Sequence, residues 1–75
     1  MIEEHAYVLL NEDLPEDGLH KGDVGVVVHI HEDDEAYEVE FLTMGGSTVA
    51  VHTLHAAQAQ AVDARMIPHV RDMVV

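Results

Sequence analysis

Alternating apolar and polar residues in the middle of the chain predict three consecutive β-strands. Residues 24–31 are rich in β-branched side chains, and residues 36–43 place apolar side chains on one face and glutamates on the other. A third apolar run covers residues 48–54. The acidic tip at residues 32–35 and the glycine-rich turn at residues 44–47 separate these runs, so we expect two antiparallel hairpins.

The flanking segments predict two further strands and one short helical turn. Residues 5–10 form the first apolar run, and a long ordered loop follows over residues 11–23. An Ala/Gln-rich stretch near residues 55–62 favours one short helical turn. The apolar residues 67–75 are expected to form a last strand beside the first. The pattern is typical of a mainly β protein, a small, strongly bent antiparallel barrel of about five strands.

The acidic tip also fixes an expected register for the first hairpin. A four-residue tip gives these pairs: Ile30 with Tyr37, His29 with Glu38, Val28 with Val39, Val27 with Glu40 and Val26 with Phe41. One face of the hairpin is then wholly apolar, as a half-buried antiparallel sheet requires. In the second hairpin a two-residue loop sets Phe41 against Ala50 and a three-residue loop sets it against Val51. We favour the three-residue loop with a bulge, because it keeps valines on the core side. Tyr7 is expected to join Tyr37, Val39 and Phe41 in the core or in a shallow aromatic groove.

Charge excludes several functional classes. The 75 residues contain 15 acidic and 3 basic side chains, a formal charge of −12, together with seven histidines. Phosphate backbones and anionic membranes are bound mainly through Lys and Arg, so neither nucleic acid nor membrane is an expected partner. The length allows one domain over residues 1–75, and the chain has no cysteine. We expect a folded cytoplasmic protein without a cofactor.

Three motifs, in order and spacing, resemble a small bacterial family, domain of unknown function four-nine-two-six. They are residues 13–19 (Asp-Leu-Pro-Glu-Asp-Gly-Leu), residues 21–27 (Lys-Gly-Asp-Val-Gly-Val-Val) and residues 37–41 (Tyr-Glu-Val-Glu-Phe). The resemblance extends over roughly residues 5–73. It implies an SH3-like small barrel without catalytic residues, and an antitoxin-like or accessory partner of a neighbouring gene product. The histidines depart from the family pattern, so any role for them is not inherited from it.

Histidines provide a candidate metal site. His29 and His31 are two apart on one expected strand, so their side chains leave the same face, and Glu38 is expected across from His29. Imidazole and carboxylate ligands suit Zn²⁺, Ni²⁺ or Cu²⁺. Two other interpretations stay open, namely a solvated face of His–Glu pairs and a pH-sensitive interface.

Acidic clusters provide a candidate protein-binding surface. It consists of Glu12, Asp13, Glu16, Asp17, Glu32, Asp33, Asp34 and Glu35. Such a surface steers a basic partner and speeds association. The alternative interpretation is a set of solvated turns.

Catalytic motifs are lacking in the sequence. Ser47 is the one serine and it follows Gly45-Gly46 in a turn, so no nucleophile stands out and we expect no enzyme. The apolar C-terminal residues 66–75 have two interpretations. They form the last strand, or they exchange with a second copy of the chain and produce a homodimer.

Overall fold

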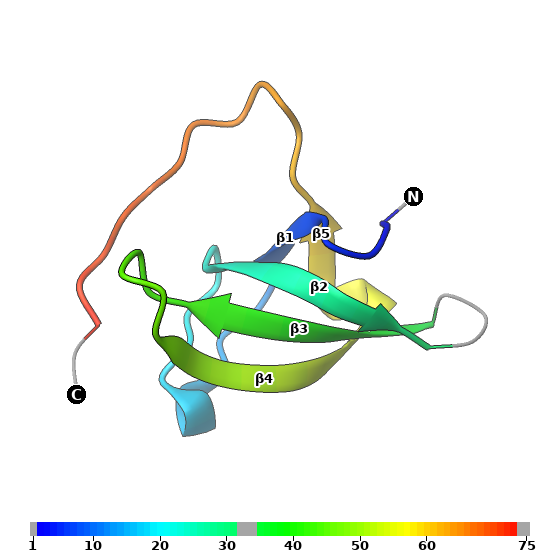
Figure 1. Ribbon diagram of the computed structural model, residues 1–75, viewed down its shortest axis with the longest axis horizontal. Coiled ribbons are helices and arrows are strands. Elements are labelled where there is room, and N and C mark those ends of the chain that lie inside the picture. Colours follow the sequence, from blue (N-terminus) through cyan, green and yellow to red (C-terminus); the bar gives the residue numbers. More distant parts are fainter. Residues whose placement is uncertain (1, 32–34, 74–75) are drawn as a thin grey trace.

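Five strands form one antiparallel sheet in the computed structural model, which describes residues 2–31 and 35–73 (Figure 1). The strands are β1 (Tyr7–Leu10), β2 (Val24–Ile30), β3 (Ala36–Leu42), β4 (Thr48–His55) and β5 (Ala59–Ala61). Two 3-10 helices, η1 (Pro15–Asp17) and η3 (Ala56–Gln58), accompany them. No helix in this part of the chain is long and apolar enough to cross a membrane.

The strand order β4-β3-β2-β1-β5 confirms a mainly β fold and leaves β4 and β5 as the two edges of an open sheet. The expected helical turn is confirmed in a shorter form, η3. The expected last strand over residues 67–75 is wrong, because described residues 62–73 contain no strand. Ala59–Ala61 leaves η3 beside β1 and fills its free edge, where Val8 pairs with Ala61.

A bulge changes the register of the first hairpin halfway along. The expected pairs Ile30–Tyr37 and His29–Glu38 are confirmed. Beyond them the register shifts between Val27 and His29, and the remaining pairs are Val27–Val39, Val26–Glu40 and Gly25–Phe41. The expected pairs of Val28, Val27 and Val26 are therefore wrong. The extra residue turns Val27 into the core, fully buried, and leaves Val28 39% exposed.

The second hairpin adopts the register that we disfavoured. Phe41 pairs with Ala50 rather than Val51, and a bulge follows between Phe41 and Leu42. This register sets Leu54 against Tyr37, where its side chain is fully buried, and leaves Val51 58% exposed. Burying the larger leucine removes more apolar area from water than burying the valine, which explains the choice.

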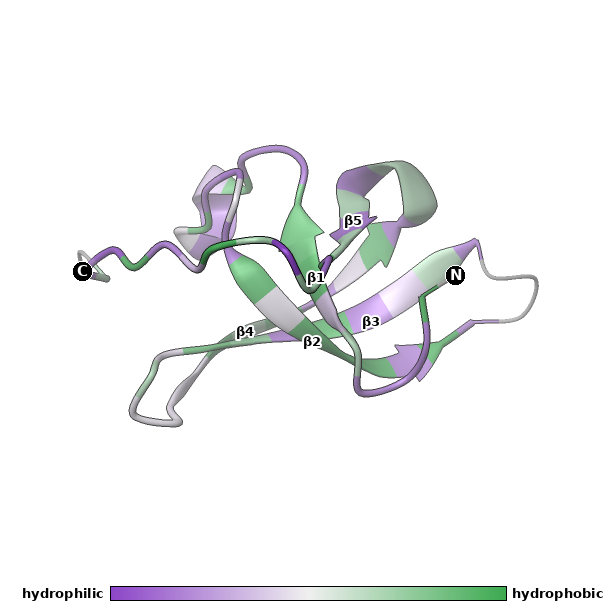
Figure 2. Ribbon diagram, turned by 90° about the horizontal axis from the view of Figure 1, so that it is seen from above, coloured by the Kyte–Doolittle hydropathy of each residue, from purple (hydrophilic) through white to green (hydrophobic). Residues whose placement is uncertain are grey.

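The core lies on the concave side of the bent sheet. Figure 2 shows β1 and β5 rising across the long arms formed by β2, β3 and β4. The buried side chains are Val8, Leu10, Leu19, Val27, Tyr37, Val39, Phe41, Leu54 and Ala59. Tyr7 was expected among them and is 61% exposed, because the two-residue period of β1 turns Val8 and Leu10 inward instead.

Candidate functional site

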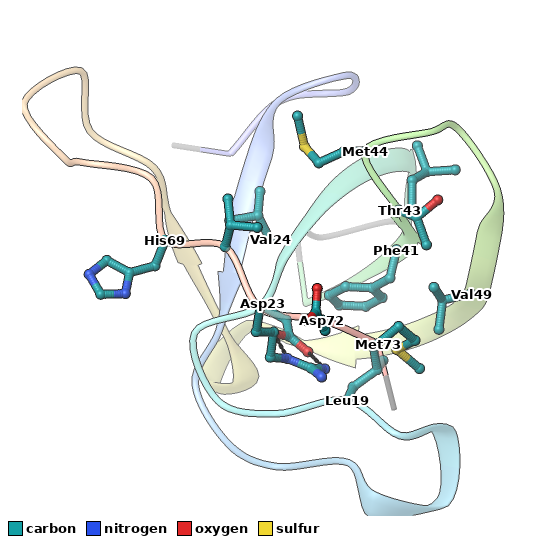
Figure 3. A pocket seen from close by; sticks show the side chains of 13 residues that line it. Leu19, Asp23, Val24, Phe41, Thr43, Met44, Val49, His69, Asp72 and Met73 are labelled. Carbon is teal, nitrogen blue, oxygen red and sulfur yellow. Dashed lines mark hydrogen bonds and ion pairs between the residues drawn. The ribbon is translucent and has the colours of Figure 1, made fainter. Parts of the chain in front are cut away.

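An open groove of about 370 Å³ lies between one end of the sheet and residues 62–73, which we call the C-terminal segment (Figure 3). Its lining residues are Leu19, Asp23, Val24, Phe41, Leu42, Thr43, Met44, Val49, His69, Val70, Arg71, Asp72 and Met73. Figure 1 shows the C-terminal segment leaving β5, passing the β3–β4 turn and ending on the opposite side of the molecule.

Apolar side chains from the edge of the core form the floor of this groove. Leu19 and Phe41 are each 2% exposed, and Val49 packs against the core beside them. Val24 and Leu42 stand at the rim, each 41% exposed. The sheet therefore offers a binding surface that is mainly apolar.

One acidic side chain interrupts this apolar surface and pairs with the C-terminal segment. Asp23 accepts two hydrogen bonds from Arg71, Nε to Oδ1 at 2.8 Å and Nη2 to Oδ2 at 2.5 Å. Arg71 Nη2 also lies 3.0 Å from the carbonyl oxygen of Gly18. The backbone N–H of His20 donates to Asp23 Oδ2 at 2.8 Å. The guanidinium and carboxylate thus meet in the two-pronged geometry that arginine favours.

These contacts keep Asp23 ionised. Burial by itself raises the pKa of Asp23, but the hydrogen bonds from Arg71 and from the His20 backbone, together with the nearby positive charge, outweigh burial. The pKa of Asp23 therefore lies below its usual value. The hydrogen bond to Asp23 raises the pKa of Arg71. The groove therefore combines an apolar floor with the ionised carboxylate of Asp23 at its edge.

Outside this pair the C-terminal segment is loosely held. Met73 packs over Gly18, and its side chain lies beside Leu19 in Figure 3. Ile67 and Val70 are 85% and 78% exposed. A segment held mainly by one ion pair is easily exchanged for another segment of the same chemistry.

The acids of the first loop, expected as a docking surface, mostly brace the loop itself. Asp13 Oδ1 accepts the backbone N–H of Lys21 at 2.8 Å, across the turn that leads into β2. Glu12 Oε2 accepts a hydrogen bond from Gln58 Nε2 at 3.3 Å, which ties the loop to η3. Both residues have structural contacts that account for their position without a partner.

The remaining acids of that surface lie in two separate places. Asp17 Oδ2 is 2.9 Å from His52 Nδ1 and joins η1 to β4, while Glu16 is exposed. Glu35 is exposed at the other end of the molecule, and residues 32–34 (Glu32, Asp33 and Asp34) lie outside the described residues. The first loop and the tip are therefore not one continuous docking site among the described residues.

The histidines expected to bind metal are close together, but they do not form a metal-ligand cluster. The rings of His29 and His31 are 5.2 Å apart and nearly perpendicular. His31 Nε2 lies 3.8 Å from Glu38 Oε2, and the same carboxylate accepts a 2.7 Å hydrogen bond from the Thr53 hydroxyl. Over residues 2–31 and 35–73, no three His, Asp or Glu side chains gather in a way that would hold a metal ion.

Sequence reasoning missed the pairing of Asp23 with Arg71. The two residues are 48 positions apart, so spacing along the chain does not connect them. A weak signal existed, because two of the three basic residues, Arg65 and Arg71, lie in the C-terminal segment, where the surrounding residues are mainly apolar. An isolated cation among apolar side chains often pairs with a partly buried carboxylate.

No curated protein and no solved structure matches the chain. A family model does match residues 4–61, most of the chain, and it includes the three motifs on which the resemblance rests. The match ends at β5 and excludes the C-terminal segment, so the expected extension of the resemblance to residue 73 is not confirmed. The expected family is thereby confirmed: the chain belongs to the family described as Domain of unknown function (DUF4926).

Proposed function

We propose that this protein is a non-enzymatic interaction module whose groove binds an extended segment of a partner protein. The bound segment carries an arginine flanked by apolar residues. The observation that carries this proposal is the position of the protein's own C-terminal segment, with Arg71 bonded to Asp23 beside an apolar floor.

The chemistry of Asp23 supports selection of arginine over lysine. An arginine presents two parallel N–H groups to a carboxylate, whereas a lysine presents a single charged point. Asp23 is 18% exposed, so its interaction with a cation is less screened by water than that of a surface carboxylate. Leu19, Phe41 and Val49 then offer contact to apolar side chains on either side of the arginine.

The extent of the family match supports the distinction between groove and occupant. Asp23, Phe41 and Val49 lie within residues 4–61, whereas residues 62–73 lie beyond the match. The floor of the groove thus lies within the matched range, and the segment that fills it lies outside that range. An incoming partner segment replaces this segment.

Net charge supports a basic partner. A formal charge of −12 attracts cationic proteins at long range and raises the rate of encounter. Glu16 and Glu35 are exposed and contribute to this field. We propose the role of an antitoxin-like or accessory partner of a neighbouring gene product, in the cytoplasm of a bacterium.

The strand connections support a finer description of the fold, an SH3-like barrel. The first strand lies between β2 and the last strand, and a 3-10 helix joins β4 to β5. The strong bend of the sheet brings β1 and β5 over one side of β2, β3 and β4 (Figure 2). We propose that β4 and β5, unpaired with each other, are the seam of this small barrel.

Calorimetric titration with a synthetic peptide of residues 66–73 tests the groove. The full-length Arg71→Gln variant, whose own segment is released, is expected to bind the peptide more tightly than the wild-type chain, because an occupied groove lowers apparent affinity. A peptide with glutamine in place of arginine should bind about tenfold more weakly. Adding Asp23→Asn should remove this difference. Equal binding of the two peptides would refute the proposed specificity.

Co-expression with the product of the neighbouring gene tests the accessory role. A complex that survives purification, and that Asp23→Asn weakens while Asp63→Asn does not, would support it. Asp63 is a suitable control, because it pairs locally with Arg65 at 3.4 Å outside the groove. If no complex forms, the accessory role fails, while the peptide titration still decides the groove.

A further inference from the structure

We propose that the free edge of β4 pairs with β4 of a second copy, antiparallel about a two-fold axis, and joins the two sheets. This surface is separate from the groove and does not depend on it. Three observations carry the inference: the length and openness of this edge, the distribution of charge, and the exposure of the residues along it.

The two edges of the sheet differ in how they are protected. The edge strand β5 has three residues, and short edge strands offer little backbone to a second chain. The other edge strand, β4, has eight residues, and within the described residues it pairs with β3 alone (Figure 1). Lysine, proline and an inward charge, three of the usual guards of an edge, are absent from its sequence Thr-Val-Ala-Val-His-Thr-Leu-His, and its bulge is confined to the start of the strand, between Thr48 and Ala50.

The charge distribution favours β4 over the rest of the surface as the place where a second copy approaches. Two copies with a charge of −12 each repel one another over most of their surface. Residues 41–62, which include all of β4, contain no Asp, Glu, Lys or Arg. β4 itself therefore adds no Asp, Glu, Lys or Arg side chain to a contact between two copies.

Three carboxylates beside this strand are already bonded, the first being Asp17, which pairs with His52 of β4. Glu40, opposite Val51, accepts a 2.7 Å hydrogen bond from the Thr48 hydroxyl. Glu38, one pair further along the same face, accepts hydrogen bonds from the Thr53 hydroxyl. The two threonines stand on β4 and donate to glutamates on β3, so both carboxylates have a hydrogen-bond partner within the sheet.

Side-chain exposure along the strand is consistent with a missing neighbour. Val51 is 58% exposed at the edge, where its cross-strand neighbour is Glu40 of β3; the same row continues through Val26 to the 61% exposed Tyr7. Antiparallel pairing of two β4 strands is self-complementary, as a two-fold interface requires. It gives Val51 a neighbour on its open side, so that the side chain is covered by a second copy.

Sedimentation measurements of the full chain over a range of concentrations test the pairing. The average mass is expected to rise from 8.3 kDa toward twice that value, and added salt should promote the dimer by screening repulsion. Val51→Lys should weaken the dimer at least severalfold, because two lysines then meet across the axis. Val28→Lys, on the interior strand β2, is the matched control and should leave it intact. A chain that stays monomeric at all concentrations overturns the proposal.

Disulfide trapping in this cysteine-free chain gives a second measurement, one that remains available if a lysine variant fails to fold. Val51→Cys and Thr53→Cys are made one at a time, and one of them should crosslink two copies readily, because identical residues near the axis face each other. Ile67→Cys, 85% exposed on the C-terminal segment, is the control for random collision. Crosslinking that follows exposure alone, fastest at Ile67→Cys, overturns the proposal.

Arg71→Gln distinguishes this dimer from an exchange of C-terminal segments. A β4 dimer should be unaffected by Arg71→Gln, whereas exchanged segments would need the bond to Asp23 and would separate. Added salt also distinguishes the two kinds of dimer. Screening should strengthen a β4 dimer and weaken a dimer of exchanged segments, which depends on an ion pair. Loss of the dimer in Arg71→Gln would assign the contact to the C-terminal segment and overturn the β4 interface.

Discussion

The sheet and the C-terminal segment are stabilised by different forces. Between Tyr7 and Ala61 the sheet is held by buried side chains, among them Val27, Val39 and Leu54 with no exposed area. The C-terminal segment has exposed apolar side chains and one ion pair to Asp23. Burial is strong and insensitive to salt, whereas a partly exposed ion pair is weak and sensitive to salt and pH.

This difference assigns the two regions different roles. Loosely held segments are the ones that proteins exchange, open or replace, because opening them leaves the rest of the fold intact. The groove floor belongs to the rigid region and its occupant to the weak one. Substitutions in the sheet should therefore change the stability of the whole molecule, and substitutions at the ion pair should change the C-terminal segment alone.

Leu54→Ala is expected to have the largest effect. Removing a fully buried leucine side chain that faces Tyr37 costs about 2–5 kcal/mol. A single core of this size provides roughly 3–5 kcal/mol of net stability, so the variant should be largely unfolded at room temperature. Urea unfolding followed by circular dichroism measures the change. Ile67→Ala, at an 85% exposed position of the C-terminal segment, is the control and should change the unfolding midpoint little.

Gly25→Ala should have the next largest effect. A Cβ atom at this position would overlap Val39 Cγ1 and lie 3.0 Å from Phe41 Cε1, both in the core. Overpacking of this kind costs about 1–3 kcal/mol. Gly45→Ala, in a turn where the nearest atom is 3.9 Å away, is the matched control. Comparable unfolding midpoints for the two variants would show that the sheet tolerates a side chain at this close approach.

The strands were predictable from the sequence, whereas the bulges and the long-range pair were not. Alternation of apolar residues located β2, β3 and β4 to within about two residues. A bulge adds one residue to a strand without changing its composition, so the shift after Val27 left no signal in the pattern. The register of the second hairpin depends on whether Leu54 or Val51 is buried in the core, and this choice requires the packed structure.

The candidate site was the least predictable feature. The acids that stood out in the sequence, such as Asp13 and Asp17, proved to be bonded within the chain. Asp23, which did not stand out in the sequence, lines the groove and binds Arg71. The role of Asp23 depends on its burial and on its pairing with Arg71, 48 positions away. Neither feature can be read from the residues that surround Asp23 in the sequence.

Arg71→Gln should release the C-terminal segment without unfolding the sheet. Its two hydrogen bonds to Asp23 are replaced by at most one uncharged contact, so the segment should be cleaved severalfold faster by a protease. The urea midpoint should stay close to that of the wild-type chain. Arg65→Gln is the matched control, because Arg65 is 91% exposed and pairs with Asp63 two residues away. A large drop in the urea midpoint of Arg71→Gln would show that the segment is part of the core.

Acidification should produce the smallest effect, and its direction follows from the lowered pKa of Asp23. The pKa of Asp23 is lower in the folded than in the unfolded chain, so the ion pair with Arg71 contributes fully to stability above about pH 4, where an unfolded aspartate ionises. This contribution is lost as the pH falls below about 4 and through the folded pKa of Asp23. The methyl resonance of Met73, which packs over Gly18, should follow this release by nuclear magnetic resonance. Asp23→Asn should remove the transition, whereas Asp72→Asn should leave it in place. A Met73 transition that persists in Asp23→Asn would mean that a group other than this ion pair holds the C-terminal segment on the sheet.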